Sequence, residues 1–152
     1  MKEATLCFLI NHKENKILLG MKKRGFGSGK YNGFGGKPNI GETIEDAAIR
    51  ELAEESGVQI KKEQMKKHAE LSFKFANKKE WDQTVHVFVS HTWTGSPIET
   101  DEMKPEWFAT DKIPFAHMWE DDKHWLPLVL SGKFVKGEFT FEGDKMLDYK
   151  LS

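Results

Sequence analysis

Three glutamates are spaced so that their carboxylates gather on one side of a predicted helix. Glu51, Glu54 and Glu55 stand three and four residues apart, which places them within about 100° of one helical face. Carboxylates held this close repel one another unless cations neutralise them, and hard oxygen ligands of this kind suit magnesium or manganese. The alternative is a solvated acidic face that binds no metal. Taken alone, the three glutamates do not decide between these two interpretations.

The helix that carries these glutamates has recognisable ends. A Thr-x-x-Asp capping signal starts at Thr43, and Gly57 stands where helices commonly end in a left-handed glycine. The pattern therefore predicts a helix from Thr43 to Ser56. Ala48 and Leu52 belong to an apolar stripe beside the glutamates. This stripe would dock the helix on a sheet and leave the acidic face open.

The segment before the helix is rich in glycine, with seven glycines from Gly20 to Gly36. Because glycine lets the backbone approach a ligand closely, we expect a loop here. Its exposed backbone N–H groups would lie beside the acidic face, where phosphate oxygens and a metal ion could meet them.

The spacing from Gly36 to Val58 decides the interpretation of the acidic face. It reads Gly-x5-Glu-x7-Arg-Glu-Leu-x-Glu-Glu-x-Gly-Val, and it fills all nine specified positions of the Nudix hydrolase signature. At average residue usage, chance agreement is on the order of 10⁻⁹ per starting point. The chain therefore resembles the Nudix hydrolases. The resemblance implies an α/β (α+β) Nudix fold, a mixed curved β-sheet sandwiched between helices, with a loop–helix–loop catalytic motif.

The same resemblance implies a role for each acidic residue. In this family the motif holds Mg²⁺, with Mn²⁺ as a substitute, against a diphosphate that a metal-activated water attacks. The metal-binding residues that it implies are Glu51, Glu54, Glu55, Glu102, Gly35 and Gly36. Arg50 and Glu42 match the pair that braces the loop. A carboxylate accepts the proton of the water; we rank Glu102 and Glu54 first, and an exposed loop glutamate is the alternative for Glu102.

The resemblance extends beyond the motif to the branch of the family that hydrolyses oxidized purine nucleoside triphosphates. It spans nearly the whole chain, as far as Tyr149, and implies substrates such as 8-oxo-dGTP and 2-hydroxy-dATP, released as the monophosphate and pyrophosphate. The substrate-binding residues that it implies are Lys22, Phe26, Asn32, Phe34, Gly35, Gly36, Lys37, Phe73, Phe75, Gln83, Trp119, Asp121, Asp122, Trp125 and Cys7.

Two features of this residue set have a physical rationale. Aromatic faces stack on any purine and contribute about 1–3 kcal/mol per base. The adjacent Asp121 and Asp122 resist double ionisation in an apolar pocket, so that the pair can offer both a donor and an acceptor. The alternatives are that these aspartates cap a second helix and that Phe73 and Phe75 belong to the core.

Three positions depart from the pattern of that branch. Cys7 stands for a threonine, Tyr31 for a tryptophan and Gln83 for a methionine. Gln83 matters most, because a polar amide replaces an apolar wall and can change the ranking of damaged bases.

Short apolar runs predict the elements that must position these residues. Thr5–Ile10 and Lys16–Leu19 predict a hairpin, and residues 133–151 predict another that turns at Glu142–Asp144. Further strands are expected at Leu71–Phe75, Val85–Val89 and Glu106–Ala109, a connector at Lys61–Lys67, and a second helix at about 121–130.

The composition limits the possible partners. With 152 residues, 38% hydrophobic and 31% charged, we expect a single domain over residues 1–152. A net charge of −1 favours a small-molecule nucleotide substrate, with no polynucleotide and no membrane as partner. One cysteine excludes an intramolecular disulfide, and Met1 leads directly into a predicted strand. We therefore expect a cytoplasmic location, although nuclear and mitochondrial pools are not readable from the sequence. The resemblance to the family implies a monomer.

Other activities remain open at this point. The rivals within the family are hydrolysis of ADP-ribose, of a dinucleoside polyphosphate or of a capped RNA end. A non-catalytic nucleotide-binding module is the rival from another class, but such modules usually lack one of the motif glutamates, and none is missing here.

Overall fold

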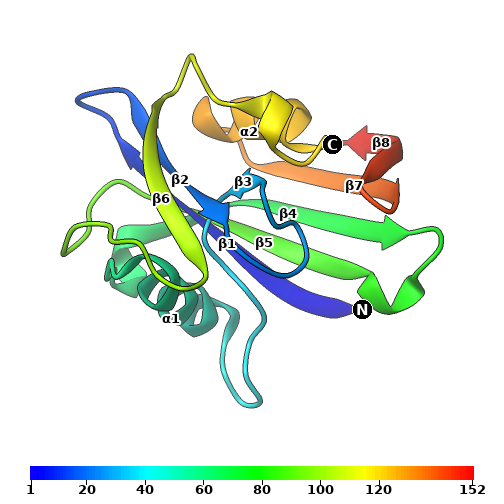
Figure 1. Ribbon diagram of the computed structural model, residues 1–152, viewed down its shortest axis with the longest axis horizontal. Helices are drawn as coiled ribbons and strands as arrows, with labels where there is room; N and C mark the ends of the chain where they lie inside the picture. Colours follow the sequence, from blue (N-terminus) through cyan, green and yellow to red (C-terminus); the bar gives the residue numbers. More distant parts are fainter.

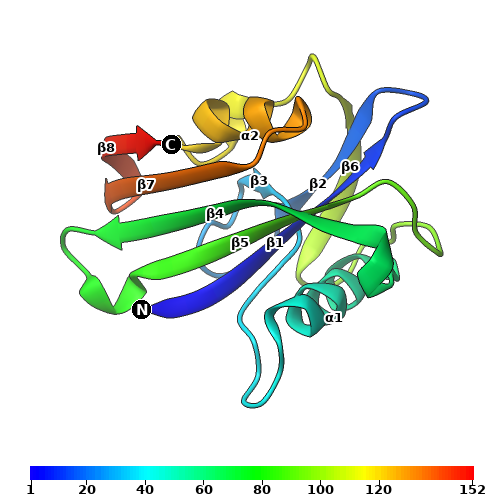
Figure 2. The ribbon, with the colours of Figure 1, turned by 180° about the vertical axis from the view of Figure 1, so that it is seen from behind.

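The computed structural model describes residues 1–152 and shows one curled, mixed β-sheet with a helix on each face (Figure 1 and Figure 2). The strand order is β3-β2-β1-β5-β4-β7-β8, and β6 pairs with β2 outside this path. The strands are β1 Lys2–Asn11, β2 Lys16–Lys22, β3 Tyr31–Asn32, β4 Met65–Phe75, β5 Gln83–Ser90, β6 Met103–Ala109, β7 Val135–Glu142 and β8 Lys145–Leu151. The helices are α1 Ile44–Ser56 and α2 Asp122–Leu130, with short 3₁₀ turns at Lys62–Gln64, Lys79–Trp81 and Phe115–His117. The expected mixed sheet between helices is confirmed.

Both predicted hairpins are present. β1 and β2 pair antiparallel with Leu9 opposite Leu18, and β7 and β8 pair antiparallel around Gly143. The parallel pairs are β1 with β5 and β4 with β7. These two crossovers bring segments that are far apart in the sequence into the centre of one sheet.

The central strands are buried on both faces. In β5, all six residues from Val85 to Ser90 are buried, although the sequence alternates. Along β1, Phe8 packs into the core under α2 together with Trp125, whereas Leu9 packs into the core under α1 together with Leu52. Because both faces of the sheet are covered, hydrophobic alternation does not distinguish one face from the other.

Helix α1 has the predicted ends. The hydroxyl Oγ1 of Thr43 accepts a hydrogen bond from the N–H of Asp46 at 3.1 Å. Gly57 adopts φ 76°, and its N–H donates to the carbonyl of Ala53 at 2.9 Å. The carboxylate of Asp46 pairs with Lys62 at 3.3 Å, so only one half of the capping box forms. Neither helix combines the length and the apolar character that a membrane span requires.

Several strands are longer than the sequence predicted. The glycine-rich segment is not loop throughout, because β2 continues to Lys22 and β3 adds Tyr31–Asn32. β4 begins at Met65, inside the expected connector, and β6 begins at Met103. The extensions follow from pairing with distant strands, since Lys22 lies opposite Met103 and Met65 lies opposite Ser90. Such partners are not visible in a local pattern.

The segment from Phe34 to Gly36 runs beside β1. β1 pairs with β2 only at its end, and closer to its start the backbone of Cys7 exchanges hydrogen bonds with that of Phe34. The N–H of Thr5 donates to the carbonyl of Gly36 at 2.8 Å. A Cβ atom at Gly35 would lie 1.7 Å from the carbonyl oxygen of Thr5, so only glycine fits. This close approach fixes the segment that leads into α1.

We expect Thr43→Ala to lower the free energy of unfolding by about 1 kcal/mol, because the first turn of α1 loses its side-chain acceptor. The melting temperature should fall by about 2–4 °C for a chain of this size. Thr43→Ser retains the hydroxyl and is the control. Equal stabilities of the two variants in denaturant titrations would contradict the assigned cap.

Candidate active site

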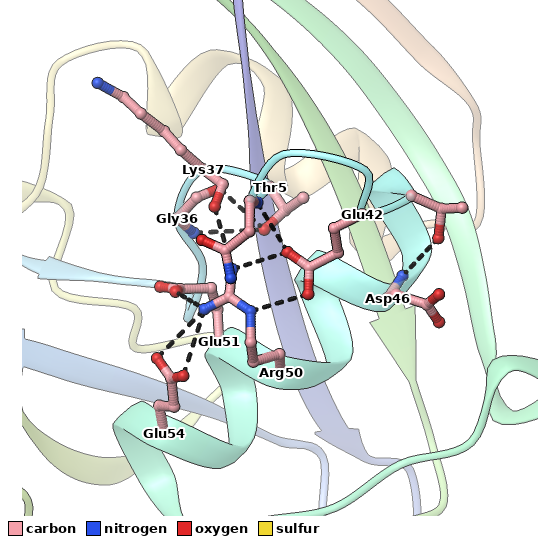
Figure 3. A network of polar contacts seen from close by, with 10 residues as sticks. Thr5, Gly36, Lys37, Glu42, Asp46, Arg50, Glu51 and Glu54 are labelled. Atoms are coloured by element: carbon pink, nitrogen blue, oxygen red, sulfur yellow. Dashed lines mark hydrogen bonds and ion pairs between the residues drawn. The ribbon is translucent and has the colours of Figure 1, made fainter.

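Arg50 is the hub of the polar network at the start of the acidic helix (Figure 3). Its Nε and Nη2 donate to the two carboxylate oxygens of Glu42, each at 2.9 Å. Nη1 donates to Glu51 at 2.5 Å and reaches Glu54 at 3.3 Å. Nη2 also donates to the carbonyl of Lys37 at 3.1 Å. One guanidinium thus joins the loop before α1 to the acidic face of the helix.

The ion pairs of this network shift the pKa values of its members. The hydrogen bonds from Arg50 lower the pKa of Glu42, assisted by the N–H of Asn39. The carboxylates of Glu42, Glu51 and Glu54 in turn raise the pKa of Arg50. Burial raises the pKa of Glu51, although Arg50 opposes this effect. The bidentate Arg50–Glu42 pair therefore stays charged, and the less neutralised carboxyl groups lie further along the helix.

Glu55 is the most strongly perturbed carboxyl group of the helix. Its Oε1 accepts a hydrogen bond from the N–H of Gly35 at 2.9 Å. Burial nevertheless raises its pKa to about 7, and the charges of Glu51 and Glu102 add to the rise. The N–H of Gly35 and the charge of Lys22 only partly oppose it. The donor and the positive charge near Glu55 therefore do not offset its burial and the neighbouring carboxylates.

The second glycine of this segment lies against Glu51. A Cβ atom at Gly36 would lie 2.2 Å from a carboxylate oxygen of Glu51. The hydroxyl of Thr5 bridges the N–H and the carbonyl of Gly36, each at 3.3 Å. The carbonyl of Gly36 is therefore occupied by β1, whereas that of Gly35 accepts no backbone hydrogen bond.

Glu102 reaches the acidic face from the segment before β6. Arg24 donates to it through Nη2 at 2.6 Å and Nε at 3.1 Å. These contacts lower the pKa of Glu102, yet its charge still contributes to the raised pKa of Glu55. Glu102 therefore lies within electrostatic range of Glu55, and its role as a metal ligand or proton acceptor stays a prediction.

The donor set fits a divalent cation by its chemistry. Glu51, Glu55 and Glu102 are hard oxygen ligands, and the charges of Glu51 and Glu102 raise the pKa of Glu55, so a cation between them would relieve the repulsion. No three such side chains are close enough together to hold one ion in the present conformation. The reason is that Arg50 holds Glu51 and Glu54, while Arg24 holds Glu102. Both Glu54 and Glu102 are exposed at the surface, so these ion pairs are weak constraints.

A cavity of about 200 Å³ opens on the α2 side of the sheet and reaches Gly35 and Gly36. The cavity therefore reaches, from the α2 side of the sheet, the same backbone segment that contacts α1 on the opposite side. The predicted substrate-binding residues that line it are Lys22, Phe26, Asn32, Gly35, Gly36, Phe73, Phe75, Gln83, Trp119, Asp121 and Asp122. Asn32 also accepts a hydrogen bond from the N–H of Gly33 at 2.8 Å, which fixes its orientation.

The floor of the cavity contains two buried aspartates. The Nε1–H of Trp125 donates to Asp121 at 2.7 Å, whereas Oδ2 of Asp122 is buried without a partner. Burial raises the pKa of both groups, and the charge of Asp121 raises that of Asp122 further. The protonated form of Asp122 is therefore favoured. Asp121 makes no capping hydrogen bond with its side chain, so helix capping does not explain the pair.

Aromatic side chains form the walls. Phe26 lies 5.0 Å from Trp119 and 6.2 Å from Phe75 between ring centroids, and it is 48% exposed. Gly27 contacts the ring of Trp119, where a Cβ atom would lie 3.2 Å from Nε1. Phe26 thus covers the cavity from a turn in which alternate glycines, Gly25 and Gly27, adopt positive φ.

Four predicted substrate contacts lie elsewhere. Cys7 and Phe34 are fully buried in the core under α1, on the face opposite the cavity, and burial raises the pKa of the Cys7 thiol to about 12. Trp125 is fully buried behind Asp121 and orients it. The Lys37 side chain is exposed and points away from the network (Figure 3). This placement corrects the prediction of direct contacts, because strand alternation turns Leu6, and not Cys7, toward the cavity.

Sequence reasoning missed other lining residues. Lys30 lines the cavity with its ammonium 5.4 Å from the Trp119 ring centroid and 3.9 Å from Asp144. Phe141 of β7 also lines it and packs edge-on against Trp119 at 5.7 Å. A basic residue within the glycine-rich segment was the available signal for Lys30. Phe141 gave none, because β7 becomes a wall only through its parallel pairing with β4.

Comparison with known proteins identifies the family of the chain. A family model described as the NUDIX domain matches residues 1–129. The chain is 50% identical over 151 residues to an oxidized purine nucleoside triphosphate hydrolase of Danio rerio, covering 99% of this chain and 94% of the relative. It is 49% identical over 137 residues to the mouse protein of the same name, covering 90% and 86%. The crystal structure of the mutator MutT protein from Bacillus halodurans superposes with a TM-score of 0.87 at 26% identity, covering 100% and 98%.

The raised pKa of Glu55 predicts a pH dependence of stability in metal-free buffer. Because the folded state holds the proton more tightly than the unfolded chain, its contribution is fully present below the ordinary pKa of 4.5 and is lost as the pH rises to about 7. Glu55→Gln cannot titrate and retains an acceptor for Gly35. We expect its unfolding free energy to fall less than that of the parent between these pH values. Parallel pH profiles in chemical denaturation would contradict the assignment.

Proposed function

The chain belongs to the Nudix family, and from this premise we propose that it hydrolyses oxidized purine nucleoside triphosphates to the monophosphate and pyrophosphate. Substrates of the 8-oxo-dGTP and 2-hydroxy-dATP type fit this proposal. The relatives at 50% and 49% identity are named for the activity. The observation that carries it is the cavity itself, in which buried aspartates and aromatic walls extend to Gly35, whose N–H donates to Glu55 of α1.

The cavity supplies what recognition of a damaged base requires. Stacking on Phe26 and Trp119 is indifferent to base identity and contributes affinity. Oxidation at C8 turns N7 of a purine from an acceptor into an N–H donor, which needs an acceptor in the pocket. Asp121 is the acceptor, whereas a protonated Asp122 offers a donor. Two neighbouring groups in opposite protonation states can accept several modified purines.

Gln83 adds an amide to the same cavity. Its carbonyl oxygen accepts a hydrogen bond and its NH₂ group donates one. The amide can therefore pair with either a donor or an acceptor on the edge of a bound base. It contributes to the ranking of substrates, separately from the aspartates.

A divalent cation would be held by Glu51, Glu54, Glu55 and Glu102, together with the carbonyl of Gly35. We favour the Gly35 carbonyl over that of Gly36, because the latter already accepts from Thr5. When bound, Mg²⁺ or Mn²⁺ offsets charge on the phosphate oxygens and acidifies a water molecule. Arg50 keeps the loop and the helix in register through Glu42 and the Lys37 carbonyl.

The remaining task is to orient the phosphates and to remove a proton. Lys22 lines the cavity and lies close enough to Glu55 and Glu102 to lower their pKa values. It can therefore pair with phosphate oxygens between the base pocket and the carboxylates. Glu54 is our first choice as proton acceptor, because it is 59% exposed and only weakly held by Arg50. Glu102 would have to leave Arg24 before it could act in this way.

We expect Glu54→Gln and Glu55→Gln to lower kcat for 8-oxo-dGTP by about 10²- to 10⁴-fold. Each variant removes a negative charge from the acidic face without changing the shape of the side chain. Pyrophosphate release with and without magnesium is the measurement, and far-UV circular dichroism checks folding. Glu45→Gln, in the first turn of α1, is the matched control. Full activity of either test variant would exclude the proposed metal-binding role of that residue.

Asp121→Asn and Asp122→Asn should each lower the preference for damaged over normal purine triphosphates by about 10- to 100-fold in kcat/KM. The reason is the loss of a charge-assisted or protonation-dependent hydrogen bond to the base. The panel is 8-oxo-dGTP, 2-hydroxy-dATP, normal dGTP and ADP-ribose, with Asp111→Asn as an exposed control. Equal kcat/KM of the parent for damaged and normal dGTP would refute the substrate class. Unchanged preferences in both variants would refute the role of the aspartates alone.

A further inference from the structure

Two histidines meet at the end of the sheet, outside the cavity and the acidic face. His12 lies in the turn between β1 and β2, and His91 directly follows β5. Their strands are parallel neighbours with Leu9 opposite Ser90, which brings the two residues side by side. This turn is the blue tip at the upper left of Figure 1. Neither residue lines the cavity, so the pair plays no part in the proposed reaction.

The two Nε2 atoms lie at the separation expected of two ligands on one ion. The Nε2 atoms are 3.2 Å apart, and the rings stack with centroids 3.8 Å apart. Two nitrogen ligands at 2.0–2.1 Å from a tetrahedral ion are separated by about 3.3–3.4 Å. Because the rings are stacked, their in-plane lone pairs run nearly parallel. Both rings lie at the surface, where rotation about the side-chain bonds can turn the lone pairs toward one point.

Hydrogen bonding leaves a lone pair available on one of these nitrogens. Nδ1 of His91 is 3.4 Å from the carbonyl of Ile10, which can only accept, so Nδ1 carries the hydrogen. Nε2 of the neutral ring then has a free lone pair. A hydrogen bond from the N–H of a metal-ligating imidazole to a backbone carbonyl is the usual way in which its tautomer is fixed. In the absence of an ion, Nε2–H of His12 must donate to this lone pair.

The surroundings of His91 disfavour the protonated form of its ring. Burial lowers the pKa of His91, and the neighbouring His12 and His68 lower it further. The lowered pKa of His91 favours its neutral form, which is the form that binds a metal ion. No third His, Cys, Asp or Glu joins the two rings, so water would complete the coordination sphere.

We propose that His12 and His91 form a surface site for a borderline divalent transition-metal ion, of the class of Ni²⁺, Cu²⁺ and Zn²⁺, which ties the β1–β2 turn to the end of β5. Imidazole suits these ions, whereas Mg²⁺ and Mn²⁺ prefer the carboxylates of α1. The site is thus separable from the catalytic centre by ligand type. Occupancy would stabilise the fold, because an ion that binds only the folded chain shifts the unfolding equilibrium.

The experiment uses the full chain without an affinity tag, titrated with NiCl₂ in excess Mg²⁺. Isothermal calorimetry should find one Ni²⁺ ion per chain. At about 100 times the dissociation constant, the melting temperature should rise by about 5–10 °C. His12→Asn and His91→Asn should each lower the affinity at least tenfold and abolish the rise. Both substitutions are at the surface, so folding without metal should be unchanged.

His117→Asn, at another exposed histidine, is the matched control and should bind like the parent. Undiminished Ni²⁺ binding in both test variants would overturn the proposal, as would a parent that binds no Ni²⁺. Loss of Ni²⁺ binding in Glu54→Gln instead would assign the ion to the acidic face and also overturn it. Magnesium-dependent hydrolysis by His12→Asn and His91→Asn should equal that of the parent. Failure of the proposed function would leave the calorimetric result unaffected.

Discussion

Mutual repulsion of carboxylates is the constraint on which the arrangement of this protein depends. Glu51, Glu54 and Glu55 share one face of α1, and the only guanidinium of the helix, that of Arg50, pairs with Glu51 and Glu54 but not with Glu55. Arg50 is itself oriented by a bidentate contact with Glu42 in the loop. The loop and the helix therefore form one electrostatic unit. Burial, together with the charges of Glu51 and Glu102, raises the pKa of Glu55, and a divalent cation beside it would favour the ionised form.

The sheet connects this acidic unit to the cavity, although the two lie on opposite faces. The connection is made by Gly35, whose N–H donates to Glu55 and whose backbone lines the cavity beside Thr5. A side chain at this position would collide with the carbonyl of Thr5. The absence of a side chain is thus what allows one backbone segment to line the cavity on the α2 side of the sheet and to contact the helix on the other side.

Burial tunes the cavity as it tunes the helix. Asp121 is stabilised by the indole N–H of Trp125, whereas Asp122 keeps an unpartnered oxygen facing a confined space. Two identical side chains that are adjacent in sequence thereby obtain different protonation tendencies. The same principle separates Glu55, which is short of donors, from Glu102, which Arg24 keeps ionised. In both places the fold gives chemically equivalent carboxyl groups different pKa shifts.

The sequence by itself determined the helix, its caps and its row of carboxylates, because helical periodicity and capping act between residues close in the chain. It also determined both hairpins and the family. Only the tertiary structure decided which distant side chains share the cavity. Cys7 was expected there, but Leu6 lines it, and Phe141 was not expected at all. The physical reason is that the central strands are buried on both faces and pair with distant partners, so neither the direction of a side chain nor its neighbours can be read from local hydrophobicity.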